Sequence, residues 1–264
     1  MQTLTPGQLD VLLVEPSGTQ RRIIEDLLRG LGVEHIQWVQ GAGTALEAMH
    51  SRQPDLVISA MHLPDMTGTE LVQEMRLDDR LRDVPFLLIS SETSLSYLEP
   101  LRQAGVIGIL PKPFDREQLE RCLYNTLDFL EPPELQLKRY APDELRVLIV
   151  DDSLTSRRMV RQVLERMGIE QFREAEDGRA AIALIEAEYF DLIITDLNMP
   201  QMDGRELSDY IRHHSNQPSV PILMFTSDQD QGRLAAIAQC GVSAVFDKPF
   251  GADVLRSTIE KVLF

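Results

Sequence analysis

Three aspartates in the second half of the chain have the residue type and spacing that phosphoryl chemistry requires. Asp151 and Asp152 follow the apolar run VLIV, and Asp196 follows the apolar run LIIT. Carboxylates held close together raise one another's pKa unless a cation neutralises them, and Mg²⁺ prefers such oxygen ligands. A carboxylate beside that cation can attack phosphorus and form an acyl phosphate. The pattern therefore predicts a magnesium site next to a nucleophilic Asp196.

A hydroxyl and an ammonium complete this set of residues. Thr226 follows the apolar run ILMF, and Lys248 follows AVFD and precedes a proline. Phosphoryl transfer depends mainly on positioning and charge stabilisation, so we expect Lys248 to neutralise the phosphoryl oxygens and Thr226 to donate a hydrogen bond. A simpler alternative is that the aspartates only cap helices, as Asp152 or Ser153 could do for the segment that follows. Capping explains a single aspartate well but explains the whole set poorly.

The segments that must position these residues are predicted to be strands and helices in alternation. Short runs rich in valine, isoleucine and leucine alternate with segments of helical periodicity, which is typical of a parallel sheet covered on both faces. Ligands of such sheets bind outside the carboxyl ends of the strands, where the aspartates, the threonine and the lysine fall. The predicted strands of this half are 146–150, 171–175, 191–195, 221–225 and 243–246.

A helix after the first strand is predicted in each half from an apolar stripe. The stripe stops at Gly32 in the first half and at Gly168 in the second, and glycine is typical of a helix terminus. We expect the stripe residues to belong to the core rather than to a cofactor surface. They are Ile23, Ile24, Leu27, Leu28 and Leu31 in the first half, and Met159, Val160, Val163, Leu164 and Met167 in the second.

The chain repeats itself at a constant offset of 136 residues. VLLVEPS at 11–17 returns as VLIVDDS at 147–153, and DLVISAMHLPDMTG at 55–68 returns as DLIITDLNMPQMDG at 191–204. A period of this length indicates a duplicated domain rather than a solenoid of short repeats.

Two adjacent prolines mark the boundary between the copies. Pro132 and Pro133 end the preceding helix pattern and begin a connecting segment. The sequence therefore predicts domains over residues 1–130 and 145–264, joined by a linker over 131–144. Each domain is long enough to bury a core of its own.

The second half resembles the response-regulator receiver domain. The resemblance spans residues 146–264 and rests on the acidic pair, the single aspartate, the threonine and the Lys-Pro pair, in that order. It implies an α/β protein with two flavodoxin-like (βα)5 domains, each with a five-stranded parallel sheet in the order 2-1-3-4-5. It also implies a two-component signalling protein that takes a phosphoryl group from a histidine kinase or a phosphotransfer protein, and not a conventional enzyme.

The same resemblance assigns roles residue by residue. Asp196 is implied to be the phosphoryl acceptor, and Asp151 and Asp152 are implied to serve Mg²⁺, with Asp152 as the direct ligand. Asn198 is implied to offer its backbone carbonyl to the metal.

Two further expectations follow from the resemblance. Thr226 and Lys248 are implied to sense and hold the phosphoryl group, and the Lys248-Pro249 bond is expected to be cis. Many receivers place an aromatic switch residue three positions before the lysine, where this chain has Val245. Phe246 is expected to face the other side of its strand, so the resemblance implies phosphorylation here without the usual aromatic readout.

The offset predicts that the first half lacks this chemistry. Alanine at the acceptor position offers no nucleophile, and proline in the acidic pair offers no carboxylate to a metal. The first half therefore resembles a pseudo-receiver that regulates or binds a partner. The residues that replace Asp151, Asp152, Asp196, Asn198, Thr226 and Lys248 are, in order, Glu15, Pro16, Ala60, His62, Ser90 and Lys112.

Three residues of the first half could be mistaken for reactive or metal-binding residues. Lys112 is expected to pair with Glu15 or to fill the vacant pocket. Ser59 is a poor substitute acceptor, because strand alternation turns it away from the side on which Ala60 lies. His62 has no histidine or cysteine near it in the sequence and is interpreted as an exposed loop residue rather than a metal ligand.

Composition excludes several classes of protein. The 26 basic and 42 acidic residues give a net charge of −16, which argues against direct nucleic-acid binding. No apolar run approaches the roughly 20 residues of a membrane span, and the start of the chain lacks a signal segment, so a cytoplasmic protein without membrane insertion is expected. Cys122 and Cys240 are interpreted as buried, inert thiols.

Other functions were weighed against the receiver hypothesis. A phosphorylation-independent scaffold and the N-terminal regulatory part of a longer regulator with an output domain are the main alternatives. A haloacid-dehalogenase-like phosphohydrolase is disfavoured, because it needs a second aspartate where this chain has Asn198. An FMN-binding flavodoxin is disfavoured by the acidic loop after the first strand. A downstream protein target and a second copy of the chain are the other expected partners.

Overall fold

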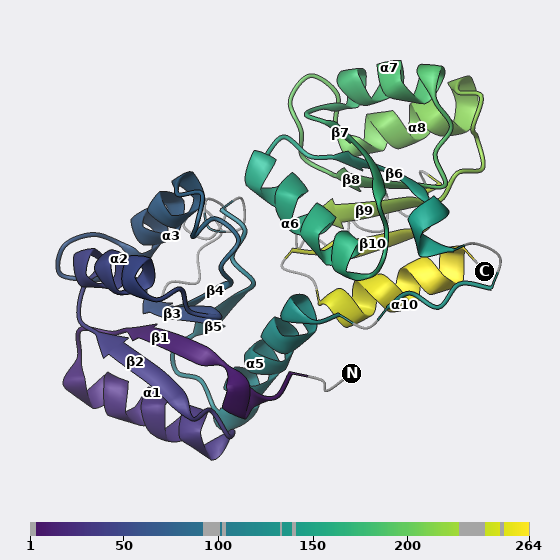
Figure 1. Ribbon diagram of the computed structural model, residues 1–264. Helices are drawn as coiled ribbons and strands as arrows, with labels where there is room; N and C mark the ends of the chain where they lie inside the picture. The colour runs from purple at the N-terminus through teal and green to yellow at the C-terminus, as the bar shows by residue number, and fades with distance from the viewer. Residues whose placement is uncertain are drawn as a thin grey trace. The chain divides into compact units, whose positions relative to one another are not determined.

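Each half of the chain builds its own five-stranded parallel sheet in a computed structural model. The structure describes residues 4–91, 101, 104–132, 134–138, 141–226, 241–248 and 251–263. The chain divides into a first unit, residues 1–131, and a second unit, residues 132–264. Figure 1 follows it from the purple N-terminus to the yellow C-terminus. Within the described stretches, no helix has the length and apolar character to cross a membrane.

Strands and helices alternate along the first unit, as its hydropathy predicts. A short 3-10 turn, Pro6–Gln8, precedes the first strand. The strands are β1 (Asp10–Val14), β2 (His35–Val39), β3 (Leu56–Ala60), β4 (Phe86–Ser90) and β5 (Gly108–Pro111), and the helices are α1 (Gly18–Gly30), α2 (Ala42–Ser51), α3 (Gly68–Leu77) and α5 (Arg116–Leu130).

Strand β1 shows how the first sheet fills a core on each face. Val11 and Leu13 pack in a cluster with α1 and α5, whereas Leu12 and Val14 pack in a cluster with α2 and α3. Successive side chains of a strand point to opposite faces, so one apolar run serves both cores. Figure 1 accordingly shows α1 and α5 on one face of the sheet and α2 and α3 on the other.

The second unit repeats this architecture. A short 3-10 turn, Pro142–Glu144, again precedes the first strand. The strands are β6 (Arg146–Val150), β7 (Gln171–Ala175), β8 (Leu192–Asp196), β9 (Ile222–Thr226) and β10 (Ala244–Asp247), and the helices are α6 (Leu154–Arg166), α7 (Gly178–Ala187), α8 (Gly204–His214) and α10 (Ala252–Val262).

The predicted fold class is confirmed, because both sheets have the strand order 2-1-3-4-5 of a flavodoxin-like fold. The orders are β2-β1-β3-β4-β5 and β7-β6-β8-β9-β10. Two of the predicted strands of the second unit match residue for residue, and three begin and end one residue later. The shift brings Asp196 and Thr226 into strands, where Asp196 pairs with Phe225.

The first helix of each unit begins and ends in the same way. A serine caps its N-terminus, because Ser17 Oγ accepts a hydrogen bond from Gln20 N and Ser153 Oγ accepts one from Ser156 N. Each helix is followed by a glycine with a positive φ, 95° at Gly32 and 96° at Gly168. Residues with a Cβ rarely adopt this conformation, which explains why the apolar stripes stop at glycine.

One residue of the predicted core is misplaced. Ile23 is 47% exposed, whereas Ile24 and Leu28 on the same helix are fully buried. Ile23 lies at the edge of the apolar stripe of α1, and only the centre of that stripe faces the sheet.

The segment that leads into β6 lies against the second unit. Leu135 is buried, and its N–H donates to the carbonyl of Met167 at 3.3 Å. Gln136 N donates to Glu260 Oε1 at 3.1 Å. Residues 134–136 therefore add contacts to the second unit.

Candidate functional site

Lys248 joins two carboxylates at the carboxyl edge of the second sheet. Its Nζ lies 2.6 Å from Asp151 Oδ2 and 2.7 Å from Asp196 Oδ1. Asp151 directly follows β6, Asp196 ends β8 and Lys248 directly follows β10, so three strands bring together residues that lie far apart in the sequence. We call Asp151, Asp152, Asp196, Thr226 and Lys248 the second-unit site.

The loop after β8 fixes the other oxygen of Asp196. Asn198 N donates to Asp196 Oδ2 at 3.1 Å, and Gly204 N donates to the carbonyl of Leu197 at 2.9 Å. A Cβ at Gly204 would lie 2.2 Å from the Asp196 carbonyl oxygen, so only glycine allows this close approach. The loop LNMPQMDG therefore fixes both the carboxylate and the backbone carbonyl of Asp196.

The remaining predicted residues are placed by the neighbouring strands. Asp152 follows Asp151 and is exposed, whereas Thr226 is fully buried at the end of β9. The Lys248 N–H donates to the Thr226 carbonyl at 2.8 Å. The expected cis bond between Lys248 and Pro249 lies outside the described residues.

The position of the aromatic switch residue follows the expectation from strand alternation. Val245 packs beside Leu197 and Met224, whereas Phe246 is buried and its ring lies 5.3 Å from that of Phe225. Phe246 is therefore a core residue of the second unit.

Crowding of negative charge is visible in the pKa values of the site. Burial raises the pKa of Asp196 to about 6, Lys248 opposes this rise, and Asp151 and Asp152 add to it. Burial and the neighbouring Asp151 also raise the pKa of Asp152. Although burial alone would lower the pKa of Lys248, its contacts with Asp151 and Asp196 raise it. The ammonium is therefore held in its charged form.

The residues present fit a hard divalent cation. Three carboxylates and one ammonium leave an excess of negative charge, and the raised pKa values of Asp152 and Asp196 partly record it. A bound cation relieves such repulsion, and carboxylate oxygens are the ligands that Mg²⁺ prefers. No group of three or more His, Cys, Asp or Glu side chains in the described part of the chain is arranged as a ready metal site. Lys248 contacts two of the three carboxylates instead.

Two residues of α6 contact the site but were missed in the sequence. Ser156 Oγ donates to Asp151 Oδ2 at 2.6 Å, and an Arg157 guanidinium N–H donates to the Asp151 carbonyl. Arg157 Nε also donates to Glu174 Oε2 on β7 at 3.3 Å. The signal available was only the closeness of Ser156 to Asp151, five residues earlier and just before the start of the helix. That spacing alone does not separate a buried hydroxyl from a solvated one.

The equivalent edge of the first sheet holds a single ion pair. Lys112 Nζ lies 3.4 Å from Glu15 Oε2, and the Glu15 side chain is only 3% exposed. The pairing expected from the sequence is therefore present. Ala60 ends β3 as Asp196 ends β8, and Ser90 ends β4. We call Glu15, Pro16, Ala60, Ser90 and Lys112 the first-unit site.

The backbone carbonyls of Glu15 and Asp151, which are equivalent in the repeat, accept hydrogen bonds from different side chains. Trp38 Nε1 on β2 donates to the Glu15 carbonyl at 2.9 Å, and the Arg21 guanidinium lies over the Trp38 ring at 4.3 Å. The repeat offset places Arg21 opposite Arg157 and Trp38 opposite Glu174. Arginine therefore binds the carbonyl itself in the second unit, whereas in the first unit it stacks on the tryptophan that does so.

Ser59 and His62 are placed as the sequence predicts, whereas Cys122 is less buried than expected. Ser59 is fully buried and its hydroxyl donates to the Ala60 carbonyl at 2.9 Å, as Thr195 does to the Asp196 carbonyl. His62 is exposed in the loop after β3. Burial raises the pKa of the Cys122 thiol, which is free and half-buried. Cys240 lies outside the described residues.

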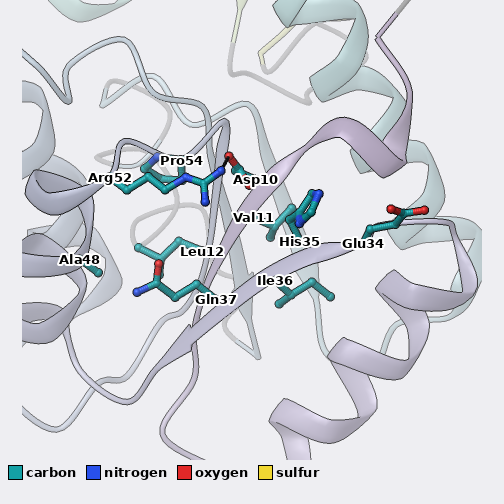
Figure 2. A pocket seen from close by; sticks show the side chains of 10 residues that line it. All are labelled: Asp10, Val11, Leu12, Glu34, His35, Ile36, Gln37, Ala48, Arg52 and Pro54. Carbon is teal, nitrogen blue, oxygen red and sulfur yellow. Dashed lines mark hydrogen bonds and ion pairs between the residues drawn. The ribbon is translucent and has the colours of Figure 1, made fainter.

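A surface pocket of about 290 Å³ lies at the opposite end of the first sheet. Figure 2 shows its lining, drawn from the starts of β1 and β2 and the end of α2, with Asp10 and Arg52 forming an ion pair. A pocket of about 290 Å³ lies at the equivalent place in the second unit, with Arg173 and Glu188 among its lining residues. Neither pocket contains a residue of the two sites.

The geometry defines a class of protein, a flavodoxin-like domain with acidic residues and a lysine at the carboxyl edge, present in two copies. The response regulator receiver domain family model matches residues 11–124 and 147–260. The chain therefore belongs to the response regulator receiver family and carries two such domains in tandem.

Curated relatives match one domain's length of the chain, whereas the crystal structure of a protein named as a two-component system response regulator/GGDEF domain protein covers 97% of this chain and 98% of its own, at 24% identity and a TM-score of 0.44. The chemotaxis protein CheY of Pseudomonas aeruginosa is 36% identical over 118 residues, which cover 45% of this chain and 95% of CheY. The chemotaxis protein CheY-3 of Vibrio cholerae is also 36% identical, over 45% of this chain and 91% of CheY-3. The crystal structure of CheY4 of Vibrio cholerae is 36% identical, covers 45% of this chain and 98% of its own, and has a TM-score of 0.42.

Proposed function

We propose that the second unit is a phosphorylation switch that accepts a phosphoryl group on Asp196. The donor is the phosphohistidine of a sensor histidine kinase or phosphotransfer protein, and the output is a contact with a downstream protein. The observation that supports this most is the Lys248 ammonium lying between the carboxylates of Asp151 and Asp196, at 2.6 and 2.7 Å. Ligands of parallel α/β sheets bind at this edge.

The ionisation of Asp196 suits a nucleophile. With its pKa at about 6, the carboxylate is mostly ionised at neutral pH, yet it is buried beside an ammonium. In the reaction, an Asp196 oxygen forms a bond to phosphorus while the bond between phosphorus and the imidazole nitrogen breaks. The nitrogen keeps the electron pair. Lys248 and Thr226 then stabilise the phosphoryl oxygens by charge and by hydrogen bonding.

Mg²⁺ is the proposed cofactor of this site. Asp151, Asp152, Asp196 and the backbone carbonyl of Asn198 would hold it. When bound, the ion supplies positive charge to the phosphoryl oxygens and to the crowded carboxylates. The supporting observation is that burial, together with neighbouring carboxylates, raises the pKa of both Asp152 and Asp196.

For the first unit we propose a pseudo-receiver that regulates the second or binds a partner. Ala60 has no carboxylate to phosphorylate, Pro16 has none to offer a metal, and Lys112 already neutralises Glu15. The scaffold is retained while the charge that would attract a cation is absent. Such a domain can still provide a surface to which another protein or domain binds.

Acetyl phosphate and Mg²⁺ test the phosphorylation switch on the full chain. Intact-mass measurement should show one phosphoryl increment in the wild type and none in Asp196→Ala. Asp191→Asn is the matched control, because Asp191 precedes the same strand at the opposite edge of the sheet and should leave the increment unchanged. A wild type that acquires no increment, or an Asp196→Ala variant that keeps it, overturns the proposal and favours a phosphorylation-independent scaffold.

A pull-down tests the proposed output. Beryllofluoride imitates the phosphoryl group, so the treated wild type should retain a partner that untreated wild type and Asp196→Ala retain weakly. Equal capture by all three samples contradicts a phosphorylation-controlled contact.

A further inference from the structure

Ser156 lies in the first turn of α6 and contacts both charged partners of the second-unit site. Its side chain is buried, with 4% of the residue exposed. Its hydroxyl donates to Asp151 Oδ2 at 2.6 Å and accepts from Lys248 Nζ at 3.2 Å. Asp151, Ser156 and Lys248 therefore form a closed triangle of contacts.

A serine hydroxyl has one donor and two acceptor positions, and this arrangement uses both kinds. The donated bond is short, as expected for a hydroxyl bound to a carboxylate. The other oxygen of Asp151, Oδ1, accepts from Ser153 N at 2.8 Å. Both oxygens of Asp151 are therefore oriented by the start of α6, and Asp151 in turn orients the ammonium.

The first unit shows the same ion pair without this hydroxyl. The repeat offset places Gln20 opposite Ser156. There the lysine to carboxylate distance is 3.4 Å, compared with 2.6 Å in the second unit. The closer ion pair is the one that includes the serine.

We propose that Ser156 is a positioning residue that orients Asp151 and retains the Lys248 ammonium beside Asp196. During phosphorylation, the contact between Lys248 and Asp196 must give way to one with the phosphoryl group. Ser156 and Asp151 then keep the ammonium anchored within reach. This second role rests on the proposed function, whereas the anchoring of the ammonium in the resting protein does not.

Nuclear magnetic resonance of the ¹⁵N-labelled full chain tests the anchoring without metal or phosphoryl donor. The Lys248 ammonium signal, identified by its loss in Lys248→Met, should exchange its hydrogens with water about tenfold faster in Ser156→Ala. Ser156→Thr keeps the hydroxyl and should stay within about twofold of the wild type, as should the neighbouring control Thr155→Ala. Circular dichroism verifies that each variant is folded. Unchanged exchange in Ser156→Ala, or a Thr variant that behaves like Ala, overturns the proposal.

Phosphorylation by acetyl phosphate at saturating Mg²⁺ tests the second role. Ser156→Ala should react about tenfold more slowly than the wild type, and Ser156→Thr within about twofold of it. A wild-type rate in Ser156→Ala overturns this role. If the wild type itself is not phosphorylated, the proposed function fails, while the exchange measurement still decides whether Ser156 anchors Lys248.

Discussion

The two sites occupy the same edge of the same fold but differ in their balance of charge. In the first-unit site, the ammonium of Lys112 balances the carboxylate of Glu15 at 3.4 Å. In the second-unit site, the ammonium of Lys248 contacts two carboxylates and a third lies beside them. The charges of the first-unit site cancel without a bound cation, whereas the second-unit site keeps a surplus of negative charge. Under the proposed function, the loss of a few carboxylates separates a scaffold from a phosphoryl acceptor while the sheet stays the same.

Grafting the missing carboxylates into the first unit gives the strongest test of this comparison. The lysine backbones already match, because Lys112 N donates to the Ser90 carbonyl at 2.7 Å and Lys248 N to the Thr226 carbonyl at 2.8 Å. Glu15→Asp, Pro16→Asp and Ala60→Asp, combined in an Asp196→Ala chain, should restore a phosphoryl increment with acetyl phosphate and Mg²⁺.

Intact mass and peptide mapping to residue 60 verify that result. The same chain without Ala60→Asp is the control and should acquire no increment. An unphosphorylated but folded graft contradicts the idea that carboxylates alone separate the two sites.

Replacing each lysine in turn shows how much its contacts with carboxylates contribute to the stability of its unit. Lys248→Met leaves two buried carboxylates without their shared partner and should lower the free energy of unfolding by about 3 kcal/mol without Mg²⁺. Lys112→Met breaks one longer and more exposed contact and should cost about 1 kcal/mol.

Urea denaturation of the full chain followed by circular dichroism, with and without Mg²⁺, measures both effects. Mg²⁺ should recover stability in Lys248→Met and not in Lys112→Met. Equal recovery in both variants contradicts a metal site confined to the second unit.

Asp196 should make the second unit less stable as the pH rises, an effect that Ala60, which has no titratable group, cannot have in the first unit. The pKa of Asp196 is raised from 3.8 to about 6, so the folded unit holds the proton more tightly than the unfolded chain, and stability falls as the pH rises through this window. Asp196→Asn lacks this loss. Without Mg²⁺, the variant should gain about 2 kcal/mol over the wild type between pH 4 and pH 7. Urea denaturation at each pH measures this, and a difference that does not grow with pH contradicts the raised pKa.

The smallest predicted effect concerns helix caps that the two units build differently. Asp65, in the loop after β3, accepts hydrogen bonds from Ala42 N at 2.9 Å and Gly43 N at 2.7 Å, whereas Asp177 caps α7 directly through Ala180 N at 2.8 Å. Asp65→Ala and Asp177→Ala should each cost about 0.5 to 1 kcal/mol, because each removes the oxygen that accepts the backbone hydrogen bonds.

The pH dependence of the first cap has the opposite sign to that of Asp196. Hydrogen bonds from Gly43 and Ala42 lower the pKa of Asp65, so its contribution is present above its ordinary pKa of 3.8 and is lost as the pH falls through its lowered value. Hydrogen exchange of α2, measured by mass spectrometry, should rise in Asp65→Ala at pH 7. Unchanged exchange in α2 contradicts the cap.

The repeat and the strand pattern were enough to predict two parallel α/β domains and the edge at which the charged residues meet, whereas the strand order followed from the resemblance to the receiver domain. Three strands of the second unit were predicted one residue early, because hydropathy does not register the polar residues Asp196 and Thr226 through which backbone pairing extends. Ile23 was misplaced for a related reason, since periodicity gives the direction of an apolar stripe but not its width.

Ser156 and Arg157 could not be predicted from the sequence with the same certainty. A serine near a helix start is usually read as a cap or a solvated residue. Its contacts with Asp151 and Lys248 depend on α6 and β10 meeting at one edge of the sheet. Arg157 donates both to the Asp151 carbonyl and to Glu174 on β7. These two contacts become evident only when the strands lie side by side in the sheet.

The position of the single tryptophan provides the chain with an intrinsic fluorophore in the first unit alone. Trp38 donates to the Glu15 carbonyl and lies under the Arg21 guanidinium, so its emission depends on the geometry of that edge. The second unit has no indole, so its proposed phosphorylation changes tryptophan emission only if the units communicate. A change in Trp38 emission when Asp196 is phosphorylated would therefore report a signal passing between the two domains without any added label.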